Sequence, residues 1–169
     1  LLHRDLAARN VLLSAKKVCK ISDFGLSRNV GDSGVYYRMC EDRLPIRWMS
    51  PEALFNNTYT TKNDVWAFGI TLWEILTFGS TPYPHMNSKG VLDMVKSGKV
   101  MDRPQHCKLE LYTVMTECWK QDAGTRPSFC DLVSKMEEMF QQETPYMNMS
   151  AFNAHLYVNI NPENLDEKL

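Results

Sequence analysis

The residues best suited to chemistry are polar side chains near the start of the chain. In the run His3–Asn10 (HRDLAARN) a carboxylate, Asp5, follows a histidine by two residues and precedes an amide, Asn10, by five. A second carboxylate, Asp23, opens the sequence Asp-Phe-Gly. Two acids and an amide in this order suit phosphoryl transfer. We expect Asp5 to accept the proton of an attacking hydroxyl, while Asn10 and Asp23 hold magnesium against nucleotide phosphates.

Two short strands are predicted between these motifs. Apolar runs at 11–13 and 18–21 flank a polar break at 14–17, a pattern typical of an antiparallel hairpin. Because a hairpin brings its open ends together, Asn10 and Asp23 should become neighbours, and oxygen ligands there could hold a hard cation. The alternative is that the two motifs are separate turns, but their order, the hairpin and the residue types together favour a joint site.

On these motifs the chain resembles the C-terminal part of a protein tyrosine kinase domain, from residue 1 to about residue 140. It is most similar to receptor tyrosine kinases of the fibroblast and platelet-derived growth factor receptor type. The resemblance implies a mainly α fold, the C-terminal lobe of the protein-kinase fold (α+β when complete), with a small β-hairpin at the catalytic loop. The N-terminal lobe would be missing.

The resemblance also implies roles for single residues. Asp5 would be the catalytic base and Arg9 would support the substrate hydroxyl. Asn10 and Asp23 would bind the metal and ATP, with Mg²⁺ as the cation and Mn²⁺ as a possible substitute, and Leu12 would line the floor under the adenine. Ala7 stands where serine/threonine kinases usually place a lysine, and the cation at Arg9 instead resembles the tyrosine-specific class.

A long segment without periodicity, residues 26–50, contains the adjacent tyrosines Tyr36 and Tyr37. They resemble the autophosphorylation sites of receptor kinases. Each phosphate would add roughly −1.5 to −2 charge, which could pair with Arg4 and order the segment. The alternative is two aromatic residues that simply pack.

Three further residues have structural roles implied by the resemblance. Glu52 is expected to form a buried ion pair with Arg126, and Asp64 to hydrogen-bond the backbone of the catalytic loop. Asp64 begins a run to Phe78 that is apolar on every face, which predicts a buried helix. Thr61 or Asn63 could cap its start and Gly79 could end it.

Three more helices are predicted from apolar periodicity. The first is short, contains Val91 and Val95 and closes at Gly98; the second contains residues 111–119. Ser128 should cap a final helix, with Asp131 as its reciprocal partner. Its expected inner face consists of Phe129, Leu132, Val133, Met136, Met139 and Phe140.

The sequence predicts two regions: a partial kinase domain at 1–141 and a flexible tail at 142–169 that is rich in polar residues. In the tail, Tyr146-Met-Asn-Met and Tyr157-Val-Asn-Ile are candidate phosphotyrosine docking motifs. Tyr146 resembles ligands of the phosphoinositide 3-kinase regulatory subunit. Both motifs resemble ligands of the growth-factor-receptor-bound adaptor, so Src-homology 2 domain proteins are expected partners. The alternative is a tail with ordinary tyrosines.

Composition limits the other function classes. The 169 residues have a net charge of −1, which gives no electrostatic argument for nucleic acid, and the five cysteines are irregularly spaced, which suits a reduced compartment. There is no apolar run long enough to cross a bilayer. Because residue 1 lies two residues before a catalytic motif, we expect the chain to be a fragment. The resemblance implies that the parent protein is a single-pass receptor, with this part on the cytoplasmic side of the plasma membrane. It would act on protein tyrosines as a ligand-driven homodimer.

Two expectations concern the missing lobe. The Gly-rich loop, strand lysine and helix glutamate of kinases do not occur in the sequence, so the chain alone should be inactive. The central helix should also expose an apolar patch, which makes the isolated chain unstable or prone to aggregate. The alternatives for the whole protein are a cytoplasmic tyrosine kinase and a pseudokinase or scaffold that acts through its tail. The presence of Asp5, Asn10 and Asp23 argues against the scaffold.

Overall fold

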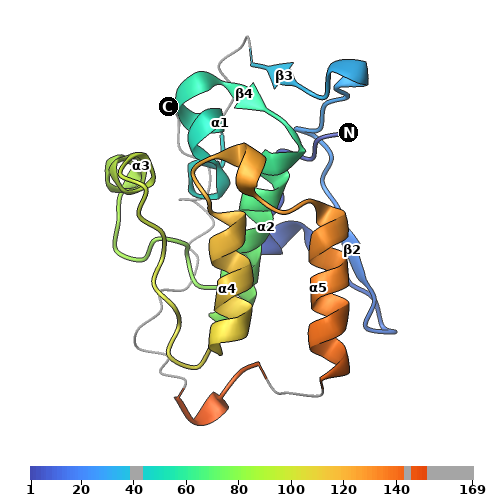
Figure 1. The fold of residues 1–169 in the computed structure, drawn as a ribbon, viewed down its shortest axis with the longest axis vertical. Coiled ribbons are helices and arrows are strands. Elements are labelled where there is room, and N and C mark those ends of the chain that lie inside the picture. The colour runs from blue at the N-terminus through green and yellow to red at the C-terminus, as the bar shows by residue number, and fades with distance from the viewer. Residues whose placement is uncertain (39–43, 143–145, 152–169) are drawn as a thin grey trace.

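The computed structural model describes residues 1–38, 44–142 and 146–151, and it is mainly helical (Figure 1). Two two-stranded antiparallel sheets accompany the helices. The elements are η1 Ala8–Asn10, β1 Val11–Leu13, β2 Cys19–Ile21, η2 Gly31–Ser33, β3 Tyr36–Tyr37, η3 Ile46–Trp48, α1 Pro51–Asn56, β4 Thr58–Tyr59, α2 Thr61–Leu76, α3 Ser88–Lys96, α4 Leu109–Cys118, η4 Ala123–Thr125, α5 Phe129–Gln141 and η5 Met149–Ala151. The predicted fold class is therefore confirmed.

The start of α2 differs from the sequence prediction. Neither Thr61 nor Asn63 caps the helix; Thr60 does, in an extended conformation with φ −136°. Its side chain accepts a hydrogen bond from the Lys62 amide, and the Asn63 side chain accepts one from the Thr60 amide. This capping box satisfies amides at the helix start that have no partner within the helix. Asn63 is thus the reciprocal partner of the cap.

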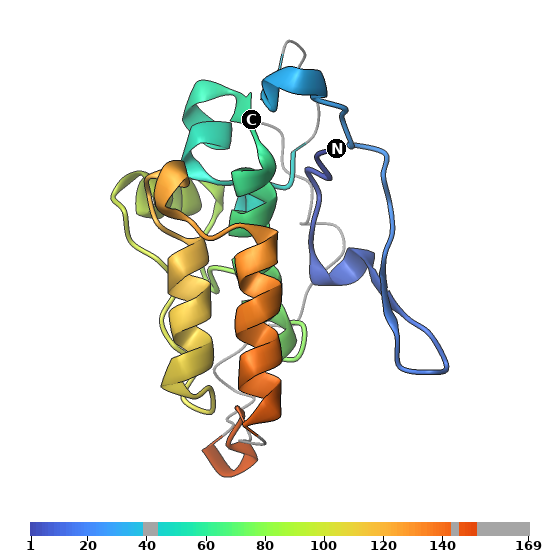
Figure 2. The ribbon, with the colours of Figure 1, turned by 45° about the vertical axis from the view of Figure 1, so that its right-hand side comes forward.

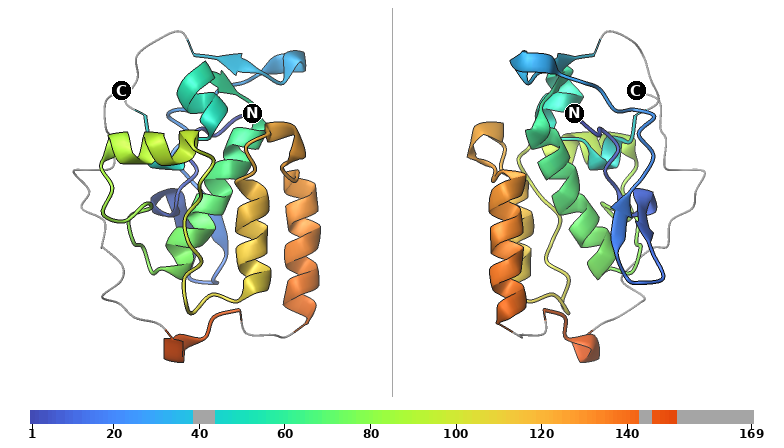
Figure 3. Two further views of the ribbon diagram at one scale, coloured as in Figure 1. Left: turned by 60° about the vertical axis from the view of Figure 1, so that its left-hand side comes forward. Right: turned by 90° about the vertical axis from the view of Figure 1, so that its right-hand side faces the viewer.

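The centre of the lobe is α2, which is buried over most of its length, as its apolar sequence predicts. It packs against α4, η1, η3 and η4. In Figure 2, α4 and α5 run side by side, while the right-hand view of Figure 3 shows α2 between them and the β1–β2 hairpin. The end of α2 is closed by Gly79, whose amide donates to the Glu74 carbonyl over 2.8 Å at φ +85°. The loop that carries Asp5 and the C-terminal helices therefore share one support.

The predicted hairpin can be compared with the strand pairing. In the predicted hairpin, Val11 pairs with Ile21 and Leu13 with Cys19, in antiparallel register. A second pairing, which the sequence did not indicate, joins Tyr36 to Tyr59. It brings the tyrosine segment next to the start of α2.

The three later helices, α3, α4 and α5, lie where the periodicity predicts them. Gly98, at φ +76°, follows α3 and donates its amide to the Val95 carbonyl. At α5 the predicted capping box is present: the Ser128 side chain accepts from the Asp131 amide, and the Asp131 carboxylate accepts from the Ser128 amide at 2.8 Å. These caps confirm the predicted helix boundaries.

The inner face of α5 is only partly covered, contrary to the prediction. Leu132 and Met139 are buried, but Val133 is 56% exposed and Phe140 is 84% exposed. The reason is an open apolar groove of about 660 Å³ between α2 and α5. Its lining is Phe68, Phe129, Leu132, Val133, Met136, Glu137, Phe140 and Gln141. The expected exposed apolar patch beside the central helix is therefore present.

Residues 146–151 belong to the stretch for which the sequence predicts a flexible tail. They pack against the lobe: Met147 forms an antiparallel bridge with Cys107, and η5 follows. Figure 1 shows this segment beneath the lower ends of α4 and α5. Tyr157, the other docking candidate, lies outside the described residues.

Two further findings concern the described part of the chain. Four cysteines, at 19, 107, 118 and 130, are free thiols in the described part of the chain, and Cys40 lies outside it. No helix within residues 1–38, 44–142 and 146–151 combines the length and the apolar character needed to cross a membrane.

Candidate active site

The loop that carries Asp5 is fixed from the start of α2. The Asp64 carboxylate accepts hydrogen bonds from the His3 and Arg4 amides, each over 2.9 Å. Burial raises the pKa of Asp64, and these two bonds oppose the rise because they favour the ionised form. Arg4 has a φ of 68°, in the left-handed region that costs a residue with a Cβ. The expected contact of Asp64 with the loop backbone is present, and it holds that strained conformation.

A second buried carboxylate, Glu74, fixes the other end of the loop, and sequence analysis missed it. Its Oε2 accepts from the Ala8 amide over 3.0 Å and from Trp48 Nε1 over 2.7 Å. Glu74 is fully buried, burial raises its pKa, and its Oε1 has no hydrogen-bond partner among the described residues. The available signal was a single charged residue inside the apolar run 65–76.

The Asp5 carboxylate is oriented by two neighbours on the same loop. Asn10 Nδ2 donates to Asp5 Oδ2 over 2.9 Å and to the Asp5 carbonyl over 2.8 Å. Arg9 Nη2 forms an ion pair with Asp5 Oδ1. The Arg9 guanidinium in turn lies 4.4 Å from the centroid of the Trp48 ring, a cation–π contact. The structure thus brings three of the predicted residues together: Asp5, Arg9 and Asn10.

The hairpin brings Asn10 close to the Asp-Phe-Gly motif through the backbone. The Ser22 amide donates to the Asn10 carbonyl over 2.8 Å, and the Ser22 hydroxyl donates to the same atom over 2.9 Å. Asp23 follows directly, with an exposed side chain, a φ of 59° and a carboxylate that accepts from the Gly25 amide over 3.2 Å. Leu12, on β1, is 58% exposed. Asn10 and Asp23 therefore flank one open surface at the mouth of the hairpin.

These oxygen atoms suit a hard cation. Asn10 Nδ2 makes the side-chain hydrogen bonds described above, so the side-chain oxygen Oδ1 is the Asn10 atom that could bind a cation, and Asp23 offers an exposed carboxylate. An amide oxygen and one carboxylate, completed by phosphate and water, are a donor set that Mg²⁺ prefers. Within the described residues no three His, Cys, Asp or Glu side chains gather into a metal cluster.

His3 links the two motifs, a role that sequence analysis did not assign. Its Nδ1 accepts from the Asp5 amide over 3.3 Å, and its Nε2 lies 3.0 Å from the Ser22 carbonyl. Since Nδ1 accepts, we assign the ring proton to Nε2, which donates to Ser22. The ring also packs edge-on against Phe24, with centroids 4.9 Å apart.

Arg4 lies between two tyrosine rings. Its guanidinium carbon is 4.8 Å from the centroid of Tyr36 and 4.4 Å from that of Tyr59. Nη1 donates to the Leu26 carbonyl over 3.2 Å, whereas the buried Nε and Nη2 have no hydrogen-bond partner in the described part of the chain. Tyr37 is 64% exposed. A buried cation with spare donors thus adjoins the tyrosine pair.

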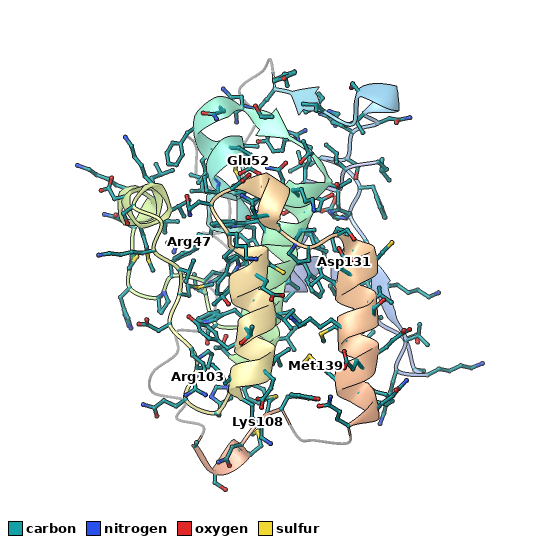
Figure 4. All side chains as sticks on the ribbon, in the orientation of Figure 1. Arg47, Glu52, Arg103, Lys108, Asp131 and Met139 are labelled. Atoms are coloured by element: carbon teal, nitrogen blue, oxygen red, sulfur yellow. The ribbon has the colours of Figure 1, made fainter. Side chains whose placement is uncertain are left out.

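The expected ion pair of Glu52 and Arg126 is present. Arg126 Nη1 and Nη2 donate to the two carboxylate oxygens over 2.7 and 2.8 Å, a bidentate geometry. Figure 4 labels Glu52 beside α1, at the end of the lobe that carries the start of α2. The pair joins residues 74 positions apart in the sequence.

An apolar cavity of about 450 Å³ lies next to the site. His3, Phe24 and Asp64 contribute to its wall, and Phe68 and Phe129 belong both to this cavity and to the groove between α2 and α5. The catalytic loop therefore adjoins a continuous apolar surface.

Comparison with known proteins identifies relatives of this arrangement. The family described as protein tyrosine and serine/threonine kinase matches residues 1–136. The chain is 42% identical over 160 residues to the tyrosine kinase receptor Cad96Ca of Drosophila melanogaster, covering 95% of the chain and 21% of that protein. It is 44% identical to a fibroblast growth factor receptor of Strongylocentrotus purpuratus (89% and 16% covered) and 45% identical to one of Hydra vulgaris (88% and 18% covered). The chain thus spans about a fifth of the length of these relatives.

Proposed function

Because the chain belongs to the protein tyrosine and serine/threonine kinase family, we propose that it is the C-terminal lobe of a kinase that transfers the γ-phosphoryl group of ATP to tyrosine hydroxyls in proteins. The observation that carries the proposal is the Asp5 carboxylate, held by Arg9 and Asn10 on a loop fixed from both ends by α2. The similarity to receptor tyrosine kinases supports tyrosine as the acceptor.

Asp5 accepts the proton of the tyrosine hydroxyl as its oxygen attacks phosphorus. The bond from Asn10 keeps one carboxylate oxygen in place, and Arg9 balances the carboxylate charge until substrate binds. Arg9 then supports the substrate oxygen, and its stacking on Trp48 holds the guanidinium in position for this role. Positioning of this kind contributes most of the rate in phosphoryl transfer.

Asn10 and Asp23 would hold Mg²⁺, or Mn²⁺ in its place, against the nucleotide phosphates, and Leu12 would lie under the adenine. The metal supplies charge neutralisation at the phosphates. What supports this assignment is the exposed carboxylate of Asp23 and the amide oxygen of Asn10 at the mouth of one hairpin. The rest of the nucleotide would be bound by a second lobe.

Phosphorylation at Tyr36 and Tyr37 regulates the lobe. A phosphate there would find Arg4, a buried cation with two unpartnered donors among the described residues. Charge-assisted hydrogen bonds of this kind order loops.

The whole protein is proposed to be a single-pass receptor that forms a ligand-driven homodimer, with this lobe on the cytoplasmic side of the plasma membrane. The similarity to receptor kinases supports this assignment over a cytoplasmic kinase. After phosphorylation, Tyr146 and Tyr157 recruit Src-homology 2 domains, those of the phosphoinositide 3-kinase regulatory subunit and the growth-factor-receptor-bound adaptor.

The test fuses the chain behind the N-terminal lobe of a fibroblast growth factor receptor and measures ATP-dependent phosphorylation of a tyrosine peptide and its serine counterpart. We expect tyrosine to be preferred and Asp5→Asn to lower kcat by about 10²–10⁴-fold. Asp93→Asn, an exposed aspartate on α3, is the control and should have no effect. An Asp5→Asn enzyme with full turnover would refute the base assignment, and a fusion that folds without activity would favour the scaffold.

A further inference from the structure

We propose that Tyr146 is a phosphorylation site sequestered by the lobe itself, and that its modification prevents the segment 146–149 from docking again. The inference rests on the proposed function because it assigns regulation to one of the docking motifs. It would make recruitment at Tyr146 dependent on a prior opening of this segment.

The backbone of the segment is paired with the strand-like stretch before α4. The Lys108 amide donates to the Tyr146 carbonyl over 3.0 Å, and the Asn148 amide donates to the His106 carbonyl over 2.7 Å. Met147 lies between them in the antiparallel bridge with Cys107. The first three residues of the motif are therefore joined to the lobe by one isolated antiparallel bridge and the two hydrogen bonds beside it.

The side chains are engaged as well. Tyr146 and Met147 pack against the hydrophobic core, and the Tyr146 hydroxyl donates to the Met139 carbonyl in the last turn of α5. Figure 4 places Lys108 at the foot of α4 and Met139 on the lower half of α5, at the end of the molecule where residues 146–151 cross. Tyr146 thus contacts both the residue before α4 and the last turn of α5.

This docked form is incompatible with both uses of the motif. A kinase must reach the hydroxyl, but here it is bonded within the lobe. A Src-homology 2 domain reads the residues after phosphotyrosine, but here Met147 and Asn148 are held in backbone pairing and Met149 begins η5. Both events therefore need the segment to detach, and their rates scale with the detached fraction.

Phosphorylation of Tyr146 shifts the equilibrium between the docked and the detached segment toward the detached form. When the Tyr146 oxygen bonds to the γ-phosphorus of ATP, the bond from phosphorus to ADP breaks and the phenolic proton leaves. The product has no hydrogen to donate to the Met139 carbonyl. It also carries roughly −1.5 to −2 charge and would lie at the carbonyl end of α5, where the helix dipole is negative and Glu137 and Glu138 are in the sequence. The phosphorylated segment therefore stays detached.

The docking can be weakened without altering the motif. Lys108 has φ −69° and ψ 153° and precedes α4, so proline fits its backbone. Lys108→Pro removes the amide that bonds the Tyr146 carbonyl, whereas Lys108→Ala keeps that amide and removes only the side chain. Comparing the two variants distinguishes the contribution of this backbone hydrogen bond from that of the Lys108 side-chain charge.

The experiment uses the fusion that carries an N-terminal lobe, silenced by Asp5→Asn, as substrate of an added active tyrosine kinase and follows Tyr146 by mass spectrometry. A peptide of residues 141–153 serves as the undocked reference. We expect the peptide to react at least about tenfold faster than the chain. Lys108→Pro should accelerate the chain about two- to tenfold, the factor that one hydrogen bond represents, and Lys108→Ala should leave it unchanged.

Hydrogen exchange at the Asn148 amide provides a second measurement that does not depend on the added kinase. Protection should be present before modification and lost afterwards. Equal rates in chain and peptide, equal effects of the two Lys108 variants, or an Asn148 amide that is unprotected from the start would each overturn the inference. Failure of the phosphorylated peptide to bind a Src-homology 2 domain would instead refute the proposed recruitment and leave the sequestration standing.

Discussion

Removing Arg126 tests how much one buried side chain, which joins segments far apart in the sequence, contributes to the stability of the lobe. Arg126 is 2% exposed and is fully used as a donor. Besides its bidentate pair with Glu52, it donates to three backbone carbonyls: Lys62 over 3.0 Å, Lys120 over 2.7 Å and Gln121 over 3.3 Å. Arg126→Met keeps much of the volume and removes every donor, so it leaves a carboxylate and three carbonyls without this partner.

The expected loss follows from burial. Deleting one partner of a buried ion pair costs about 3–5 kcal/mol, and the side chain of Glu52 retains 17% exposure, which places the value near the lower limit. Glu52→Gln keeps one acceptor oxygen and should cost about 1–2 kcal/mol. Because both changes break the same contact, the double variant should lose about 1–3 kcal/mol less than the sum of the single losses.

The assay is urea unfolding followed by tryptophan fluorescence and circular dichroism, in the fusion that carries an N-terminal lobe. Trp66 lies 5.0 Å beneath the Arg126 guanidinium and gives a local probe. Lys120→Met, at an exposed lysine nearby, is the matched control and should change the free energy of unfolding by less than about 0.5 kcal/mol. A loss below about 1 kcal/mol for Arg126→Met, or strict additivity in the cycle, would refute the reasoning.

Two substitutions inside α2 give further predictions. Burial raises the pKa of Glu74, so the folded state keeps its proton to a higher pH than the unfolded state does. The free energy of unfolding therefore falls as pH rises from the unfolded-state pKa to the folded-state pKa. Glu74→Gln should flatten this pH dependence in urea titrations, and an unchanged slope would contradict it. In Gly69→Ala, a Cβ would lie 2.6 Å from Trp119 Nε1 and 2.9 Å from Cys118 Cβ. Overpacking of about 1–3 kcal/mol should outweigh the helix propensity gained, about 1 kcal/mol, so a Tm equal to or above that of the unaltered protein would disprove the close contact.

Local sequence signals predicted the β1–β2 hairpin, the helices α2 to α5 and the nucleus of the candidate site. The hairpin from Val11 to Ile21 follows from alternation over a few residues, and the cap of α5 from Ser128 and Asp131, three residues apart. Asp5 and Asn10 likewise meet within one loop. Such contacts could be predicted because the partners are close in sequence and the backbone geometry follows from their types.

Only the tertiary structure decided the contacts between distant residues. Glu74 accepts from Ala8 and Trp48 because α2 packs beneath the loop, and nothing near Glu74 in the sequence specifies those partners. The exposed side of α5 and the docking of Tyr146 depend on which surfaces neighbouring elements cover. A single sequence predicts which faces are apolar but not which elements cover them, because burial is set by the packing of the whole chain.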